Sequence, residues 1–201
     1  MEFETRSGLP IELRAESDGT ITVEGYAAVF DQPTDIGGIF IEVIARGAFK
    51  SALQRNDDVE FLINHGGLPL ARSTAGNLTM IEDDHGLKIR AQLDPSDPDV
   101  QRIVPKMRAG MLDQMSFAFQ ATGQRWDTPA VGPDVRIVTD VVLYDVSIVN
   151  RGAYPQTTIA LRARDAAREE AERAQEEARK AHDQQGYLKR KAETEQRFRN
   201  I

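Results

Sequence analysis

The chain contains two long β-patterned segments, MSFAFQAT at residues 115–122 and VRIVTDVVLYDVSIV at residues 135–149. Both are rich in β-branched and aromatic residues, which favour strands. In the first segment, the alternation places Phe117 and Phe119 on one face of a strand and Ser116 on the other. A loop rich in Pro and Gly separates the segments, so each is predicted to be a strand of its own.

Shorter strand patterns with turn signals between them precede this pair. They cover residues 11–13, 20–29, 59–63, 77–81 and 87–93, and the turn at 83–86 is typical of a hairpin. Helices are predicted at 47–55 and after the capping loop 94–98, where apolar residues recur at helical spacing and Pro105 shortens or kinks the helix. About seven strands and two helices indicate a mostly β (α+β) domain, and we expect a closed barrel with the helices packed outside.

The composition changes near Leu161, which divides the chain into a predicted body at 1–161 and a tail at 162–201. The tail has 11 Lys/Arg and 9 Asp/Glu, for a charge of +2, and the body therefore carries −9 of the total of −7. Alanines recur at intervals of three and four, which favours a helix, and Gly186 is predicted to end its first part. Two interpretations stay open: a solvated helix with i,i+4 ion pairs, and a docking tail that binds a partner.

Composition excludes several classes of function. The absence of Cys rules out disulfides, thiolate metal sites and a Cys nucleophile. The net charge of −7 disfavours nucleic acid or an anionic membrane as the main partner. No segment has the length of a signal-peptide core or the ~20 apolar residues of a membrane span, so we expect a soluble protein used inside a cell.

Three histidines and two strand serines are the candidates for chemistry. His182 lies in the charged tail, and His85 lies at the tip of a predicted hairpin. His65 directly follows an apolar strand, which places its imidazole at the end of a rigid element. Ser116 and Ser147 each lie within an apolar strand pattern, where an outward-facing structural serine is the simpler interpretation.

No short motif identifies a cofactor or metal site. The chain has no His-x-x-x-His or His-Glu-x-x-His pattern, and Gly37-Gly38 lacks the Lys-Ser/Thr of a phosphate-binding loop. A Gly-x-Ser-x-Gly nucleophile motif is also missing. We therefore expect no cofactor and no metal, and spacing alone does not specify a catalytic site.

Several blocks, in this order, resemble the prohead proteases of tailed phages, the HK97-type capsid maturation serine proteases. The resemblance runs from about Ile11 to Leu161 and depends on the order and spacing of the blocks. They are EGYAAVF at 24–30, IEVIARGAF at 41–49, FLINH at 61–65, PLA at 69–71, GMLDQMSFAF at 110–119, LYDVSIV at 143–149 and GAYPQT at 152–157.

The resemblance implies a β-barrel related to the herpesvirus assembly proteases and a set of catalytic residues. The His that ends the FLINH block is the base in that family, which implies His65, and the Ser of the MSFAF block is the nucleophile, which implies Ser116. An acid in the LYDVS block is the third member, here Asp145, and His85 is the competing choice. The chain departs from the family in having Gly66 after the histidine and Asp where Glu is common. Backbone N–H groups and an arginine such as Arg125 or Arg136 are candidate oxyanion donors.

The resemblance further implies a serine endopeptidase that acts inside the assembling procapsid in the cytoplasm of a bacterial host. It would cleave the scaffold region of the major capsid protein precursor and process itself, with self-association as a further possibility. Two other hypotheses remain: a catalytically inactive, protease-like scaffolding protein that docks through its tail, and a β-barrel binding module in which Ser116 and His65 lie far apart.

Overall fold

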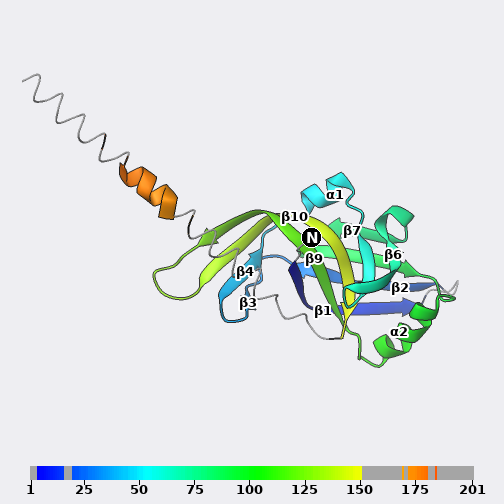
Figure 1. The fold of residues 1–201 in the computed structure, drawn as a ribbon. Helices are drawn as coiled ribbons and strands as arrows, with labels where there is room; N and C mark the ends of the chain where they lie inside the picture. Colours follow the sequence, from blue (N-terminus) through cyan, green and yellow to red (C-terminus); the bar gives the residue numbers. More distant parts are fainter. Residues whose placement is uncertain (1–3, 16–19, 151–168, 170–171, 181–183, 185–201) are drawn as a thin grey trace, which may run out of the picture. The chain divides into compact units, whose positions relative to one another are not determined.

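The computed structural model describes residues 4–15, 20–150, 169, 172–180 and 184 (Figure 1). The chain divides into two compact units, Met1–Ile159 and Ala160–Ile201. Each unit is considered by itself.

The first unit is built mainly from strands. In chain order its elements are β1 (Glu4–Ala15), β2 (Ile21–Val29), β3 (Thr34–Ile36), β4 (Phe40–Ile44), α1 (Lys50–Arg55), β5 (Glu60–Ile63), β6 (Gly66–Arg72), a 3₁₀ turn (Ser73–Ala75), β7 (Leu78–Glu82), β8 (Gly86–Leu93), α2 (Pro98–Arg108), β9 (Gln114–Asp127) and β10 (Asp134–Val149). The predicted mostly β class with few helices is confirmed.

Strand β10 pairs with β9 on one edge and with β4 and β5 on the other. It pairs with β9 in antiparallel fashion along nearly its whole length, and the two lie side by side in Figure 1. Its other edge pairs in parallel with β4 over residues 134–138 and with β5 over residues 145–148. The end of β5 is therefore fixed beside the C-terminal half of β10, two strands away from β9.

The sheet follows the order β3-β4-β10-β9-β1-β2-β8-β7, with β5 and β6 joined to it through β10. Strand β1 links the two halves, because residues 4–10 pair with β9 and residues 11–15 pair with β2. Within the described residues, no ladder joins β7 to β3, so the expected closed barrel is not found there. The relation to herpesvirus assembly proteases stays a prediction.

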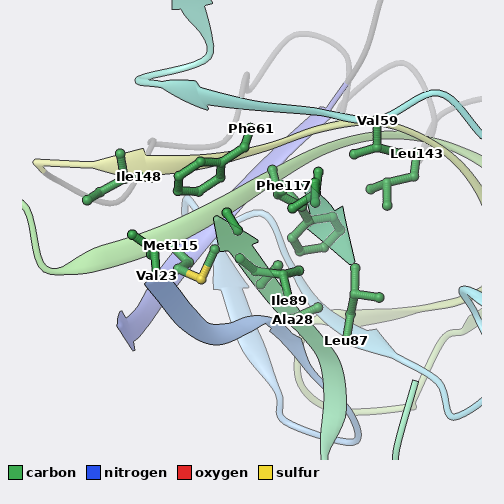
Figure 2. Close-up of a cluster of buried hydrophobic side chains, with 14 of the residues drawn as sticks. Val23, Ala28, Val59, Phe61, Leu87, Ile89, Met115, Phe117, Leu143 and Ile148 are labelled. Carbon is green, nitrogen blue, oxygen red and sulfur yellow. The ribbon is translucent and has the colours of Figure 1, made fainter. Parts of the chain in front are cut away.

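The core consists of buried apolar side chains from strands far apart in the sequence. Figure 2 shows Phe61, Met115, Phe117 and Ile89 pointing toward one another, and each is at most 2% exposed. The Phe117 ring stacks on Phe119 at 5.0 Å and meets Phe49 edge-on at 5.5 Å. Burying each such side chain contributes about 1.5–3 kcal/mol, so these contacts hold β9 firmly with its other face turned outward.

Local sequence features explain where the two helices begin and end. Asp97 caps α2 by accepting a hydrogen bond from the N–H of Asp99, and Pro98 occupies the first turn, where its missing N–H costs nothing. The helix continues through Pro105 to Arg108, and its apolar stripe is buried. Helix α1 ends at Arg55 and is capped by Asn56, whose φ of 53° lies in the left-handed region that Asn tolerates.

In the second unit, residues 172–180 are helical and exposed. Ion pairs at i,i+4 spacing join Lys180 to Glu176 at 2.7 Å and Arg173 to Glu169 at 3.2 Å. Gly186, the first alanines of the tail and the last fifteen residues lie outside the described part of the chain. Among the described helices, none has the length and apolar character that a bilayer crossing requires.

Candidate active site

Ser116 lies on the face of the sheet opposite the core. Met115 and Phe117 flank it on β9 and point inward, so the strand alternation turns Ser116 outward as predicted. On β10, Val146 and Ile148 point into the core, which turns Asp145 and Ser147 to the same outer face. The ladder pairs Ser116 with Ser147 and Ala118 with Asp145. The outer face therefore gathers a hydroxyl, a carboxylate and a second hydroxyl within two neighbouring strands.

His65 reaches this face from a tight turn between β5 and β6. Ile63 pairs with Gly66, so Asn64 and His65 form a two-residue hairpin loop, and their φ values are 52° and 57°. Positive φ at both central positions is what a type I′ turn requires, and Asn and His tolerate it better than most residues. The N–H of Asn64 donates to the carbonyl of Ile148 at 2.9 Å, which attaches the turn to β10.

The imidazole of His65 bridges the serine and the aspartate. Nε2 lies 2.6 Å from Oγ of Ser116, and Nδ1 lies 2.7 Å from Oδ1 of Asp145. The side chains of His65 and Asp145 are only 12% and 8% exposed, so little solvent screens their interaction. The structure thus brings together the three residues that the sequence analysis singled out.

A backbone carbonyl also lies within hydrogen-bond distance of the Ser116 hydroxyl. Oγ lies 2.8 Å from the carbonyl oxygen of Arg6 on β1, to which it can donate. A hydroxyl has one proton, so Nε2 of His65 and this carbonyl are alternative acceptors for it. Ser116 is fully buried, and a substrate carbonyl can reach Oγ only when a neighbouring group moves. A cavity of about 340 Å³ beside β2 and β4 is lined by Arg6 and Phe117 but by none of the three site residues.

Ser147 contacts both His65 and Asp145, which the sequence analysis did not anticipate. Its Oγ donates to Oδ1 of Asp145 at 2.7 Å and accepts from the backbone N–H of His65 at 3.1 Å. The same oxygen lies 3.3 Å from Nδ1 of His65. The available signal was the spacing: residues two apart on a strand share a face, so an outward Asp145 implies an outward Ser147.

The competing third member, His85, lies elsewhere. It occupies the turn between β7 and β8, where its ring packs edge-on against Tyr26 with 4.5 Å between centroids. Its backbone N–H donates to Asp83 at 2.8 Å. Asp145, and not His85, therefore faces Nδ1 of His65. His182 is outside the described residues.

The two arginines considered as oxyanion donors are not placed for that task. Arg125 is exposed, pairs with Asp127, and lies nine positions beyond Ser116 on β9, or about 30 Å along the strand. Arg136 is 1% exposed, and its guanidinium bonds Glu4, Glu42 and Gln124. Neither guanidinium is therefore available to the Ser116 site, because that of Arg125 lies far along β9 and that of Arg136 is already bonded within a buried cluster.

Arg136 belongs to a buried cluster of four charges that holds β1 against β4 and β10. Arg6 bonds Glu42 through Nε at 2.5 Å and Glu4 through Nη2 at 2.7 Å, and Arg136 bonds both carboxylates. Burial alone would raise the pKa of the Glu4 carboxyl, but Arg136 and Arg6 hold that pKa below its usual value of 4.5. Burial would lower the pKa of Arg6, but Glu42 and Glu4 keep it raised. The hydrogen bonds within the cluster fix the segment of β1 whose carbonyl meets Ser116.

The described residues contain no group of three or more His, Asp or Glu side chains that could hold a metal. The chemistry that the outer-face residues themselves offer is proton transfer and nucleophilic attack. A hydroxyl within hydrogen-bond distance of an imidazole, which a carboxylate contacts on its other nitrogen, is the arrangement of an activated serine.

The chain is similar to known proteins both in fold and in sequence. The capsid assembly protease of bacteriophage T4 has a similar fold, with a TM-score of 0.50 and 13% identity over 74% of this chain and 99% of that one. The prohead protease of Enterobacteria phage HK97 is 31% identical over 152 residues, which cover 74% of this chain and 64% of that protein. The chain thus spans less than two thirds of this relative's length. The family model described as caudovirus prohead serine protease matches residues 9–172, and the chain belongs to that family.

Proposed function

We propose that this protein is a serine endopeptidase that cleaves the scaffold region of a phage major capsid protein precursor, and also itself, inside the assembling procapsid in the host cytoplasm. Ser116 is the nucleophile, His65 the general base and Asp145 the residue that stabilises the charged imidazole. The observation that carries the proposal is the continuous chain of contacts from Ser116 Oγ through both nitrogens of His65 to Asp145 Oδ1. Membership of the prohead protease family supports the reaction class and the capsid substrate.

The first half of the reaction transfers the Ser116 proton to Nε2 of His65 while Oγ attacks the carbonyl carbon of the scissile peptide bond. The imidazole becomes a cation, and the Asp145 carboxylate next to Nδ1 stabilises it. His65 then gives the proton to the leaving amine, the C–N bond breaks, and the N-terminal part of the substrate remains as an ester on Ser116. Base catalysis of this kind supplies about 10²–10⁴-fold.

In the second half of the reaction, water is the nucleophile and the ester on Ser116 is hydrolysed. His65 takes a proton from the water, the resulting hydroxide attacks the ester carbonyl, and the proton returns to Ser116 Oγ as the ester bond breaks. Because the enzyme ends with its original protonation, His65 acts as base and acid in each half.

Cleavage of the capsid precursor tests the proposal. The purified protein is mixed with the precursor, and products are followed on denaturing gels and by mass spectrometry. We expect discrete fragments with the wild type and none with Ser116→Ala. Ser96→Ala is the matched control, since it removes an exposed hydroxyl from the loop before α2 and should leave cleavage unchanged. Unchanged cleavage by Ser116→Ala would refute the assignment of the nucleophile.

The same experiment separates the inactive, protease-like scaffolding protein from the enzyme. A scaffolding protein would bind the precursor, and no fragments would form with any variant. The contacts of His65 favour the enzyme, because they place its imidazole between a hydroxyl and a carboxylate, in the order that an activated serine requires.

We further propose that the chain consists of a protease domain at 1–161 and a helical docking tail at 162–201. The exposed, charged helix at residues 172–180 supports this role, since it leaves its side chains available to a partner. Truncation after Leu161 should leave peptide cleavage intact and reduce incorporation into procapsids. Normal incorporation of the truncated protein would argue against docking.

We also propose that the fold is an open variant of the herpesvirus assembly protease barrel. The single core of buried apolar side chains and the histidine in the turn that follows β5 support this relation. Superposition on a solved herpesvirus protease should align β5, β9 and β10, and a different strand order around the serine would contradict it.

A further inference from the structure

Ser147 makes more contacts with the site than a structural serine on a strand needs. It is fully buried and lies directly opposite Ser116 in the β9–β10 ladder. Its Oγ lies within 3.3 Å of three polar atoms that belong to His65 or Asp145. The hydrogen-bonding capacity of the hydroxyl determines what these contacts do.

A serine hydroxyl has one proton to donate and two lone pairs to accept with. The proton goes to Oδ1 of Asp145 at 2.7 Å, which is the shortest of the three contacts. One lone pair accepts the backbone N–H of His65 at 3.1 Å, because that group can only donate. The remaining lone pair is the only part of the hydroxyl that can face Nδ1 of His65, 3.3 Å away.

Nδ1 of His65 is consequently surrounded by acceptors. Asp145 Oδ1 accepts at 2.7 Å, and Ser147 Oγ has already donated its proton. A nitrogen that faces two acceptors is satisfied only when it carries the hydrogen, and in a neutral imidazole the other nitrogen is then unprotonated. The lone pair of Nε2 therefore points at Ser116 Oγ, which is the tautomer a general base needs.

We propose that Ser147 is a positioning residue that fixes the tautomer and the orientation of His65, a role that rests on the proposed protease function. It acts through His65 and Asp145, to which its hydroxyl is hydrogen-bonded. Its bond to the His65 N–H also holds the turn at a φ of 57°, and its bond to Oδ1 keeps the carboxylate aimed at Nδ1. Without Ser147, the backbone amide loses its partner and the carboxylate can rotate.

The test replaces Ser147 by Ala in the full chain and measures two independent quantities. The first is the kinetics of peptide cleavage. We expect kcat to fall about 10–10²-fold with KM within about twofold, because misplacing a catalytic group affects the transition state more than substrate binding. Ser147→Thr keeps a hydroxyl on a β-branched side chain that suits a strand, and should recover most of the loss.

The second quantity is the tautomer itself, which ¹⁵N NMR of histidine-labelled protein reports without any substrate. The wild type should show His65 protonated at Nδ1, with a strongly downfield Nδ1 proton. In Ser147→Ala, that proton signal should weaken or exchange faster. A wild type with the hydrogen on Nε2 would overturn the proposal, whether or not the variant folds.

Ser73→Ala is the matched control. Its hydroxyl also accepts from a backbone N–H, that of Val59 at 2.9 Å, and donates to the carbonyl of Asp57 at 3.1 Å, but it lies outside the site. This variant should keep kcat and the His65 spectrum unchanged, even where its melting temperature falls. Equal kcat in Ser147→Ala and the wild type would refute the positioning role. If the wild type cleaves nothing but the tautomer responds to Ser147→Ala, the protease function fails and the positioning role stands.

Discussion

Replacing Asp145 by Asn removes a negative charge that lies 2.7 Å from Nδ1 of His65 while keeping nearly the same shape. The amide oxygen of Asn can still accept from Nδ1 and from Ser147, so the resting hydrogen bonds can persist. What the variant loses is the attraction between the carboxylate and the imidazolium that forms in the transition state.

The size of that loss follows from the geometry. With about 4 Å between the centres of charge and an effective dielectric constant of about 20, the attraction amounts to about 4 kcal/mol. Because about 1.4 kcal/mol corresponds to a factor of ten in rate, kcat should fall about 10³-fold. A further loss, toward about 10⁴-fold, follows if the amide rotates and donates to the imidazole, which selects the wrong tautomer.

The assay is steady-state cleavage of a capsid-derived peptide, with kcat and KM determined separately. KM should stay within about twofold, since Asp145 contacts His65 and not the substrate. Asp127→Asn makes the same charge change at an exposed position on β9, where the carboxylate pairs with Arg125, and should retain full activity. If folded Asp145→Asn keeps more than about a tenth of the wild-type kcat, the carboxylate does not stabilise the imidazolium by the calculated amount.

The remaining predictions concern stability. Phe61→Ala empties a fully buried core position and should lower the free energy of unfolding by about 3–5 kcal/mol in denaturant titrations; a loss under 1 kcal/mol would contradict the packing. Arg136→Ala leaves Glu4 and Glu42 short of a counter-charge and should cost about 3–5 kcal/mol; an unchanged melting temperature would count against the buried cluster. The pKa of Glu4 is lowered below 4.5, so its ion pairs contribute their full stabilisation above that pH and lose it as the pH falls through the lowered pKa. Thermal melts from pH 6 to pH 2 should show this decline in stability. The decline should be smaller in Glu4→Gln.

The sequence predicted the central strands well because their two faces differ so clearly. The alternation at 115–119 predicts Phe117 in the core and Ser116 on the opposite face of the strand, and the structure places both residues accordingly. Strand β9 nevertheless continues to Asp127, beyond the predicted end at residue 122. Among the described strands, its second half pairs with β10 alone and is largely exposed, so it carries no apolar alternation for a sequence pattern to detect.

Strands β4 and β6 were missed for different reasons. Strand β6 begins with Gly66-Gly67, residues typical of a turn, and it forms because the ladder to β5 supplies its hydrogen bonds. Strand β4 alternates buried and half-buried residues over Phe40–Ile44, a pattern that could have been recognised. Closure of the sheet depends on which distant edges meet, and no local pattern carries that information.

The site was predicted by resemblance and not by spacing. Ser116, His65 and Asp145 come from three strand ends separated by up to 80 residues, and only the parallel pairing of β5 with β10 brings His65 to the serine. The contact between the Arg6 carbonyl and Ser116 could not have been predicted, because every residue has a backbone carbonyl and the sequence does not show which one lies beside the serine. The place of Ser147 in the site could have been predicted, because a residue two positions from Asp145 on a strand lies on the same face.

Mapping the residue that a serine-directed inhibitor modifies tests the central claim most directly. The protein is treated with a fluorophosphonate during cleavage of the capsid precursor, and the adduct is located by mass spectrometry as activity disappears. We expect one adduct, on Ser116, formed in step with the loss of cleavage and absent from His65→Ala. Loss of cleavage with the adduct on another serine, or full activity with Ser116 modified, would show that the imidazole of His65 does not activate this hydroxyl for peptide hydrolysis.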